Sequence, residues 1–465
     1  MDQAQSRTAP LSSNLCGLNY ACPPLNIDRV RSRLIERWTE FQGYTPNDRS
    51  LFYLCMEIVP IGIASGAFAF NGPFVLKLGG SSAMLGAMAS LPALMVILFT
   101  LPAARFMERV ANRKPWIVGS LALSRMIYLF IALTPWLVPP EARAIAVVAL
   151  IVLQAVPLAL FNTAFLALIA EICPPDRRSA LFALRTTLLS ASVAIGSIAC
   201  GFFLDLIAFP LNHQLLNLVG FGLAQYSTVL VGRMHYPLAT VIAPAPASNP
   251  AELASPMTKK PGRLSWTEFK TFARANRTFV NFNLVTLICW LGAWGAAPLY
   301  TIYFVRELGL SNSWLGLNTT LAQVAVVLSA PLWQRLIRAK SAMWVLLRTV
   351  VLTGLYPWLL ALFPWPTPLL LAGFANTLND TAIGITHPSI FFDIIPEARR
   401  TSFIAVHTTL MNFGAMIAPL LTAPMADLFG VSLVLLACGV FRFGGGLLFW
   451  VLPMRTSQSA AAENR

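Results

Sequence analysis

Charged residues are scarce in this chain, and their scarcity excludes most classes of soluble protein. Only 11% of the 465 residues are charged, whereas 57% are apolar. A soluble domain has about 25% charged residues, because charges cover its surface. The solvent around most of this chain is therefore expected to be lipid rather than water.

The chain also lacks the short motifs of soluble enzymes and metal sites. Its seven cysteines include no C-x-x-C pair, and its four histidines are not spaced as metal ligands. It contains no GxxxxGK[ST] phosphate loop, and no HExxH, GxSxG or Rossmann-type glycine pattern. We therefore expect no enzymatic activity, no cofactor and no resident metal, and we expect any work to be driven by a gradient.

What the sequence does contain is long apolar runs. A helix of about 20 apolar residues crosses a bilayer core of about 30 Å, and lipid requires every backbone polar group to be bonded internally, which favours helices. The sequence predicts an all-α polytopic membrane protein with twelve transmembrane helices in two bundles of six. The expected spans are 51–76, 83–104, 115–137, 143–170, 180–208 and 214–233, followed by 279–304, 313–338, 342–364, 367–392, 402–427 and 431–453.

The two sets of spans repeat each other in sequence. Phe74–Ser81 reappears as Phe304–Ser311 at an offset of 230, and Glu171–Arg178 reappears as Asp393–Arg400 at an offset of 222. Repetition on this scale in an apolar chain indicates a transporter built from two homologous bundles with a site between them.

The distribution of basic residues predicts the orientation. If the N-terminus is cytosolic, three basic residues lie in the outer loops: Lys77, Arg143 and Arg306. Eleven lie in the short cytosolic loops: Arg105, Arg109, Arg113, Lys114, Arg177, Arg178, Arg335, Arg338, Lys340, Arg399 and Arg400. This bias follows the positive-inside rule. The net charge of +14 thus mostly reflects basic residues in the cytosolic loops that set the membrane topology. We therefore expect no nucleic-acid partner.

Polar segments divide the chain into five parts. We expect a cytosolic tail over 1–50, a six-helix bundle over 51–233, a cytosolic linker over 234–278, a second bundle over 279–453 and a cytosolic tail over 454–465. Within the first tail, Ile27–Phe41 has apolar residues at helical spacing with arginines between them, which suits either a helix on an anionic leaflet or a partly ordered tail.

The loop after the second span carries a more specific signal. Glu108-Arg109-Val110-Ala111-Asn112-Arg113-Lys114 resembles the Gly-x-x-x-Asp-Arg-x-Gly-Arg-Lys loop of the major facilitator superfamily, with Glu108 in place of Asp and Ala104 in place of the first Gly. The matching loop of the second half, Pro331–Lys340, keeps the basic residues and lacks the acidic one. The resemblance implies that Glu108, Arg109, Arg113 and Lys114, with Arg399 and Arg400 opposite, take part in gating.

The same resemblance implies that the first and fourth spans of each half line a central cavity. In span ten, Asn376, Asp380 and His387 share one helical face, and Asn379 lies beside them. In span one, Glu57 and Asn71 share a face with Ala64 and Phe68. Further expected contributors to the cavity are Gln154, which matches Asn376 at the offset of 222, and Trp290 and Trp294 of span seven. Each of these residues is also compatible with a purely structural role in helix packing.

Two carboxylates are candidates for proton coupling, Asp380 and Glu57. A charge near the middle of a span costs about 2.5–3.5 kcal/mol on insertion scales, so such residues are usually retained for function. Burial favours the protonated form of a carboxylate, which lets it alternate between two states. Four arginines within the spans could instead neutralise a carboxylate, bind an anion or reach toward an aqueous face: Arg125, Arg185, Arg348 and Arg442.

These observations predict a monomeric secondary transporter of the plasma membrane that moves a small organic solute by alternating access. Proton coupling is the expected driving force. The aromatic, sparsely charged cavity favours an amphipathic solute or a drug-like efflux substrate over a small ion. The alternatives are a non-transporting receptor or assembly factor of the same fold, and an intramembrane enzyme, for which the sequence offers no nucleophile and base.

Overall fold

The computed structural model describes residues 46–110, 112–236, 276–395 and 400–452, and these residues are almost entirely helical, with no β-strand among them. The expected helix over Ile27–Phe41 and most of the expected linker lie outside the described residues.

The first half contains six spans. The first is divided into three helices, α2 (Pro46–Met56), α3 (Ile58–Phe68) and α4 (Asn71–Lys77). The other five are α5 (Ser82–Arg109), α6 (Lys114–Leu137), α7 (Arg143–Ile172), α8 (Pro175–Leu206) and α9 (Leu211–Gly232), with a short 3₁₀ helix η1 (Pro140–Ala142) before α7.

The second half repeats this order. Its first span is α11 (Arg277–Ile302), which ends in the π-helical turn η3 (Tyr303–Glu307). The other spans are α12 (Asn312–Ala339), α13 (Ala342–Thr353) with α14 (Leu355–Leu362), α15 (Pro366–Ile394), α16 (Arg400–Phe429) and α17 (Val431–Val451).

Eleven stretches of the described chain are long and apolar enough to cross a membrane. The tenth expected span, α15, is 29 residues long and is not among the eleven. It carries Asn376, Asn379, Asp380 and His387 along its length. The layout of six and six helices is confirmed, and the span that falls short in hydropathy is one of those expected to face the cavity.

Prolines explain why two spans are broken, which the sequence prediction treated as continuous. A proline inside a helix lacks the N–H that would bond the carbonyl four residues earlier, and its ring clashes with that carbonyl. Pro60 and Pro73 disrupt the turns at Met56 and Ala69, where α2 and α3 end. Pro357 likewise disrupts the turn at Thr353, where α13 ends. Glu57 therefore lies at the first break, between α2 and α3.

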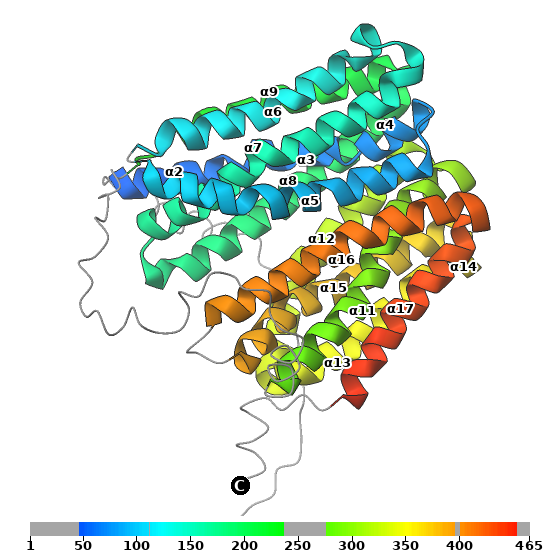
Figure 1. Ribbon diagram of the computed structural model, residues 1–465. Coiled ribbons are helices and arrows are strands. Elements are labelled where there is room, and N and C mark those ends of the chain that lie inside the picture. The colour runs from blue at the N-terminus through cyan, green and yellow to red at the C-terminus, as the bar shows by residue number, and fades with distance from the viewer. Residues whose placement is uncertain (1–45, 111, 237–275, 396–399, 453–465) are drawn as a thin grey trace, which may run out of the picture.

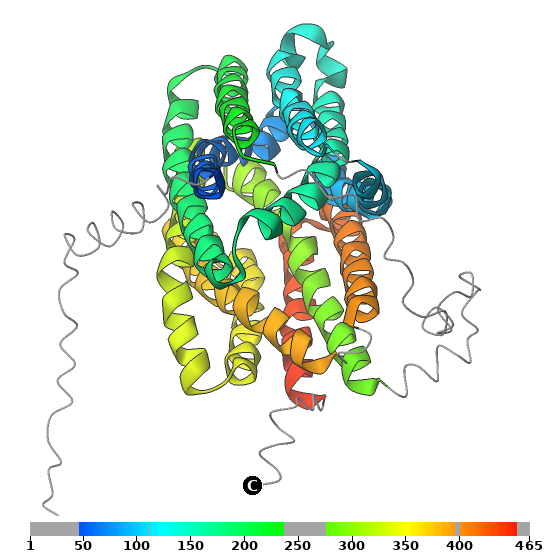
Figure 2. The ribbon, with the colours of Figure 1, turned by 90° about the vertical axis from the view of Figure 1, so that its left-hand side faces the viewer.

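The two halves meet at one end of the molecule and separate at the other. Figure 1 shows the first half above the second, and the two in close contact at the right, where α5 approaches α16. At that end one apolar cluster takes residues from both halves, including Phe74 and Leu85 from the first and Leu299 and Leu435 from the second. At the other end each half has its own cluster. Figure 2 looks onto this second end, with the first half above and the second half below.

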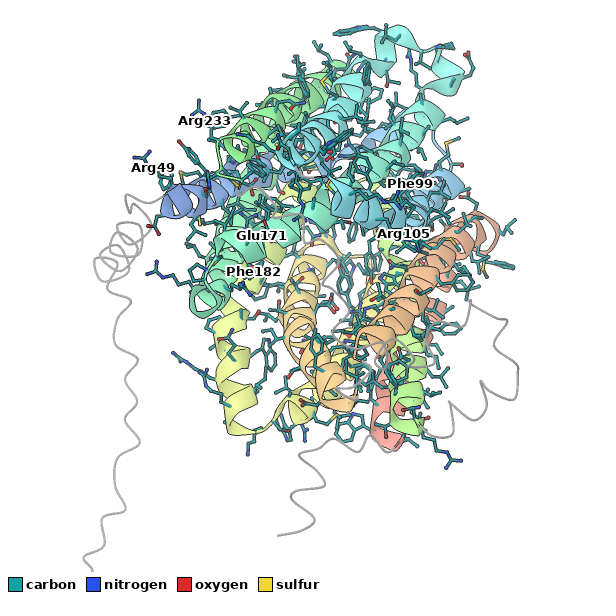
Figure 3. The ribbon with its side chains drawn as sticks, turned by 60° about the vertical axis from the view of Figure 1, so that its left-hand side comes forward. Arg49, Phe99, Arg105, Glu171, Phe182 and Arg233 are labelled. Carbon is teal, nitrogen blue, oxygen red and sulfur yellow. The ribbon has the colours of Figure 1, made fainter. Side chains whose placement is uncertain are left out.

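We call the second end the basic end, because the loops rich in arginine and lysine lie there, and the first the closed end. Figure 3 shows Arg49, Arg105, Glu171 and Arg233 of the first half at the basic end.

Candidate functional site

A cavity of about 860 Å³ lies between the halves, lined by α8 of the first half and by α12 and α15 of the second. Its walls combine apolar side chains, such as Phe182 and Val326, with hydroxyl and amide groups. Phe182 lies at the edge of the first half that borders the second (Figure 3). The polar lining residues are Thr186, Thr187, Ser190, Gln334, Thr377, Asp380 and Thr381.

Asp380 is the ionisable residue of this lining, and it has a partner. Arg442 of α17 donates a hydrogen bond to its Oδ1 in an ion pair, and Asn376 Nδ2, one turn earlier on α15, donates to its Oδ2 at 2.9 Å. The side chain of Asp380 is 40% exposed, whereas that of Arg442 is 9% exposed. Arg442 therefore compensates the negative charge of Asp380 from the buried side of the pair, while Asp380 remains accessible from the cavity.

Glu57 forms a matching pair in the first half, but its environment is different. Arg185 Nη2 of α8 donates to Glu57 Oε1 at 2.8 Å, and Ser227 Oγ of α9 donates to Glu57 Oε2 at 2.7 Å. Arg185 also donates to the carbonyl of Leu54. The Glu57 side chain is only 5% exposed. Both carboxylate oxygens of Glu57 are thus bonded within the first half. These bonds connect the first span to α8 and α9.

Two polar clusters join the halves at the closed end, and the first is centred on Asp205 at the end of α8. Its carboxylate accepts hydrogen bonds from the backbone N–H groups of Asn312 and Ser313 at 3.1 and 2.8 Å, and from Asn312 Nδ2 at 2.7 Å. Lys77 Nζ donates to Asn312 Oδ1 at 3.0 Å. A carboxylate at the N-terminus of α12 is favourable, because the first N–H groups of a helix are unpaired and carry partial positive charge.

The second cluster is centred on Asp427 at the end of α16. Ser82 Oγ, in the first turn of α5, donates to Asp427 Oδ1 at 2.5 Å. Arg306 Nη1 donates to Ser82 Oγ at 2.9 Å and lies 3.6 Å from Asp427, and Arg306 also donates to the carbonyl of Gly80.

The internal repeat relates these clusters. Asp205 matches Asp427 at the offset of 222, and Asn312 matches Ser82 at the offset of 230. In each cluster an aspartate from one half meets the first turn of a helix from the other half, with a basic side chain beside it. The same interaction, an aspartate bonded to the first turn of a helix in the other half, therefore occurs twice at the closed end.

Glycines allow the helix backbones to approach closely at this end. A Cβ atom on Gly316 of α12 would lie 2.5 Å from the carbonyl oxygen of Ser197 on α8, and one on Gly86 of α5 would lie 2.6 Å from that of Pro419 on α16. Any larger residue at either position would force the halves apart where they now touch.

Gly316→Leu should therefore open the closed end. We expect the distance between spin labels at Glu141→Cys and Glu307→Cys, both exposed at that end and in different halves, to lengthen in pulsed electron resonance measurements. Gly444→Leu is the matched control, because a Cβ there meets no atom within 4 Å. A folded Gly316→Leu protein with the parent distance would show that this contact does not hold the end closed.

The remaining residues expected in the cavity are not part of its lining. Gln154 lies beside the Tyr128 hydroxyl, and Phe68 stacks on the Tyr128 ring with centroids 3.3 Å apart. Asn71 is buried, and its Oδ1 has no hydrogen-bond partner among the described residues. Asn379 donates back to the carbonyl of Ala375 on its own helix.

Phe282 and Trp290 of span seven pack beside His387, and Trp294 packs against α16. His387 is buried, with Nε2 3.0 Å from Thr286 Oγ1 and its ring stacked on Phe282. Trp290 lies beside it, with ring centroids 4.8 Å apart. Trp294 packs close to Gly414 of α16.

The two other arginines within the spans donate to backbone carbonyls, and Arg125 also donates to a hydroxyl group. Arg125 Nη1 donates to Ala224 O and Thr228 Oγ1 of α9, at 2.5 and 2.7 Å. Arg348 donates to Trp344 O and lies over the Trp344 ring, 3.7 Å from its centroid. The sequence did not show which arginines pair with carboxylates. Arg185 and Arg442 do so, and each has its partner on another helix.

Comparison with known proteins agrees with this architecture. The sequence profile described as Major Facilitator Superfamily matches residues 55–276 and 282–465. The chain belongs to the Major Facilitator Superfamily. None of the curated proteins with which it was compared matches it.

Solved structures with the same fold are distant in sequence. A bacterial homologue of the human lysosomal transporter Spinster, inward-facing and occupied, is 14% identical with a TM-score of 0.62, over 88% of this chain and 97% of that one. A mutant of the nucleoside transporter NupG is 15% identical with a TM-score of 0.62, over 86% and 99%. A bacterial homologue of the iron transporter ferroportin, in an inward-facing state, is 14% identical with a TM-score of 0.65, over 87% and 98%.

The superfamily's gating loop is described in part. Arg113 Nη1 donates to Glu171 Oε1 at 2.9 Å, and Lys114 Nζ lies 5.5 Å from the centre of the Tyr236 ring. Arg109 is exposed. Arg399 and the side chains of Glu108 and Arg400 lie outside the described residues, so the gating role of this loop remains a prediction.

Proposed function

We propose that this member of the Major Facilitator Superfamily is a secondary transporter that moves a small organic solute across the plasma membrane by alternating access, coupled to protons through Asp380. The observation that carries the proposal is the Asp380–Arg442 pair in the wall of a cavity between the two halves. A charged pair at this depth of a membrane protein is costly, and it is retained where a site needs it.

The closed end supports alternating access. Two related polar clusters and a shared apolar cluster hold the halves together there, whereas the apolar clusters of the basic end belong to one half each. If the basic loops are cytosolic, as the positive-inside rule favours, this is an inward-facing state. An outward-facing state would require the aspartates to leave the first turns of α5 and α12.

We assign the coupling to Asp380 rather than Glu57, because only a carboxylate that reaches the cavity can exchange a proton with its water. Asp380 is 40% exposed and Glu57 is 5% exposed. Protonation of Asp380 removes the charge that holds Arg442. The freed guanidinium can then change its contacts within the second half, because it lies behind Asp380 and is not part of the cavity lining.

The lining favours an amphipathic organic solute. Apolar side chains alternate with five hydroxyl groups and one amide around a single carboxylate, and the carboxylate is already paired. Such walls suit a molecule with a hydrophobic body and a few hydrogen-bonding groups, and drug-like efflux substrates are among these. The nucleoside transporter NupG, which has a similar fold, is also named for a small organic solute.

The direct test is a solute screen in proteoliposomes of the full chain. Nucleosides, short peptides and amphipathic amines are applied in turn, with and without a pH gradient, and net solute movement is measured. The proposal expects pH-driven movement of at least one solute class. A receptor or assembly factor of the same fold would instead bind a ligand without net movement.

The topology makes a separate prediction. With both termini and the segment 234–278 in the cytosol, a cysteine placed at Ser248, outside the described residues, should not react with an impermeant maleimide in intact cells and should react after permeabilisation. Glu141→Cys, in an outer loop, should react in intact cells. Labelling at position 248 in intact cells would show that this segment lies outside the cell and that the predicted topology is inverted.

A further inference from the structure

An apolar groove lies on the outer face of the first half, away from the cavity. It has a volume of about 560 Å³ and is lined by residues of α5, α6 and α7. Its lining includes two prolines and one glycine, Pro102 on α5, Pro157 on α7 and Gly119 on α6, and a Cβ atom on Gly119 would meet no atom within 4 Å. Phe106 of α5 and Trp116 of α6 both line the groove, with their rings edge to face and their centroids 4.7 Å apart.

The groove continues along the membrane-spanning length of α5. A second cavity of about 590 Å³ lies between α5 and α7 and shares Val156 with the first. Together they are lined from Ala83 to Phe106 of α5, which corresponds to about 34 Å of helix. The lining is apolar along this length except for Ser120, whose hydroxyl donates to the carbonyl of Ile117 on its own helix, so the groove suits an extended hydrocarbon chain.

Positive charge gathers where the groove reaches the basic end. Arg109 lies three residues after Phe106 and seven after Pro102, so all three share one face of α5. Arg109 and Arg105 are exposed, and neither contacts a carboxylate among the described residues. Figure 3 shows Phe99 and Arg105 on this part of α5. The neighbouring Arg113 and Lys114 are instead engaged with Glu171 and Tyr236.

From this juxtaposition we infer that the groove binds one anionic phospholipid of the leaflet at the basic end, with an acyl chain along Phe99, Phe106 and Trp116 and the headgroup phosphate at Arg109 and Arg105. Any lipid can fill an apolar groove. The two arginines select for negative charge, and each basic residue near a membrane surface contributes about 1 kcal/mol toward an anionic lipid, or about fivefold in affinity.

Quenching of Trp116 tests this inference without any knowledge of the solute. The full chain is placed in phosphatidylcholine vesicles, and dibrominated phosphatidylglycerol or dibrominated phosphatidylcholine is added in increasing proportion. The difference between the parent and Trp116→Phe isolates the signal of Trp116 among the twelve tryptophans. We expect half-maximal quenching at a mole fraction up to about 25-fold lower for the anionic lipid, about fivefold for each arginine, and we expect this preference to weaken at high salt.

Two variants separate the headgroup contacts from the groove itself. Arg105→Gln with Arg109→Gln should remove the anionic preference while leaving quenching by both lipids. Gly119→Leu should fill the groove and reduce quenching by both, whereas Gly222→Leu on α9 should not; a Cβ at either glycine meets no atom within 4 Å, so both variants should fold. Equal curves for the two lipids in the parent, or an anionic preference that survives loss of both arginines, would overturn the inference.

Discussion

Asp380→Asn is expected to abolish proton-driven accumulation of solute while leaving solute binding and exchange across the membrane. The amide keeps the shape of the side chain and its contact with Asn376 but cannot be ionised. A pH gradient of one unit supplies about 1.4 kcal/mol, enough for about tenfold accumulation with one proton per solute. The variant should show no accumulation, and its exchange rate should lose its dependence on pH. The measurement is uptake and counterflow in proteoliposomes with a solute found in the screen.

Asp393→Asn is the matched control for this experiment. Asp393 is on the same helix, at the basic end, and is exposed. Its replacement should leave both accumulation and the pH profile as in the parent. If Asp380→Asn also behaves like the parent, Asp380 is a structural residue, and coupling belongs to another group or another ion.

Glu57→Gln is expected to act on stability rather than on coupling. Arg185 would remain buried without its counter-charge, and breaking a buried pair by removal of one partner costs about 3–5 kcal/mol. We expect a large fall in the midpoint of thermal unfolding in detergent, followed by intrinsic fluorescence. Asp380→Asn should lower the midpoint less, because Asp380 is partly solvated by the cavity.

The double variant Glu57→Gln with Arg185→Met provides the control for this second prediction. Replacement of both members of a buried pair by uncharged groups of similar volume is often close to neutral. The double variant should therefore recover much of the stability lost in Glu57→Gln. A stable Glu57→Gln protein that no longer accumulates solute would instead show that Glu57, and not only Asp380, takes part in proton coupling.

The sequence predicted the twelve spans and their order, because the apolar runs and the repeat are strong signals over long windows. It also predicted α15 as a polar span, since Asn376, Asp380 and His387 interrupt an otherwise apolar helix. The breaks in the first and ninth spans lie four residues before Pro60, Pro73 and Pro357, but proline alone could not have predicted them. Other prolines, such as Pro92 and Pro157, lie inside helices that stay continuous.

The partners of the charged residues could not be predicted, because each pair joins helices that are distant in the chain. Arg442 reaches Asp380 from α17, 62 residues further along the chain. Arg185 reaches Glu57 only because α8 packs beside α3. The repeat offsets could have related Asp205 to Asp427. They could not have shown that each aspartate bonds to the opposite half.

The most direct test of alternating access is the side from which the cavity can be reached. Thr381 lines the cavity one residue after Asp380, so Thr381→Cys reports access when an impermeant maleimide is applied to oriented vesicles from either side. In the parent we expect labelling mainly from the basic end. With Gly316→Leu added, labelling should move to the opposite side. Labelling from the same side in both proteins would contradict the account.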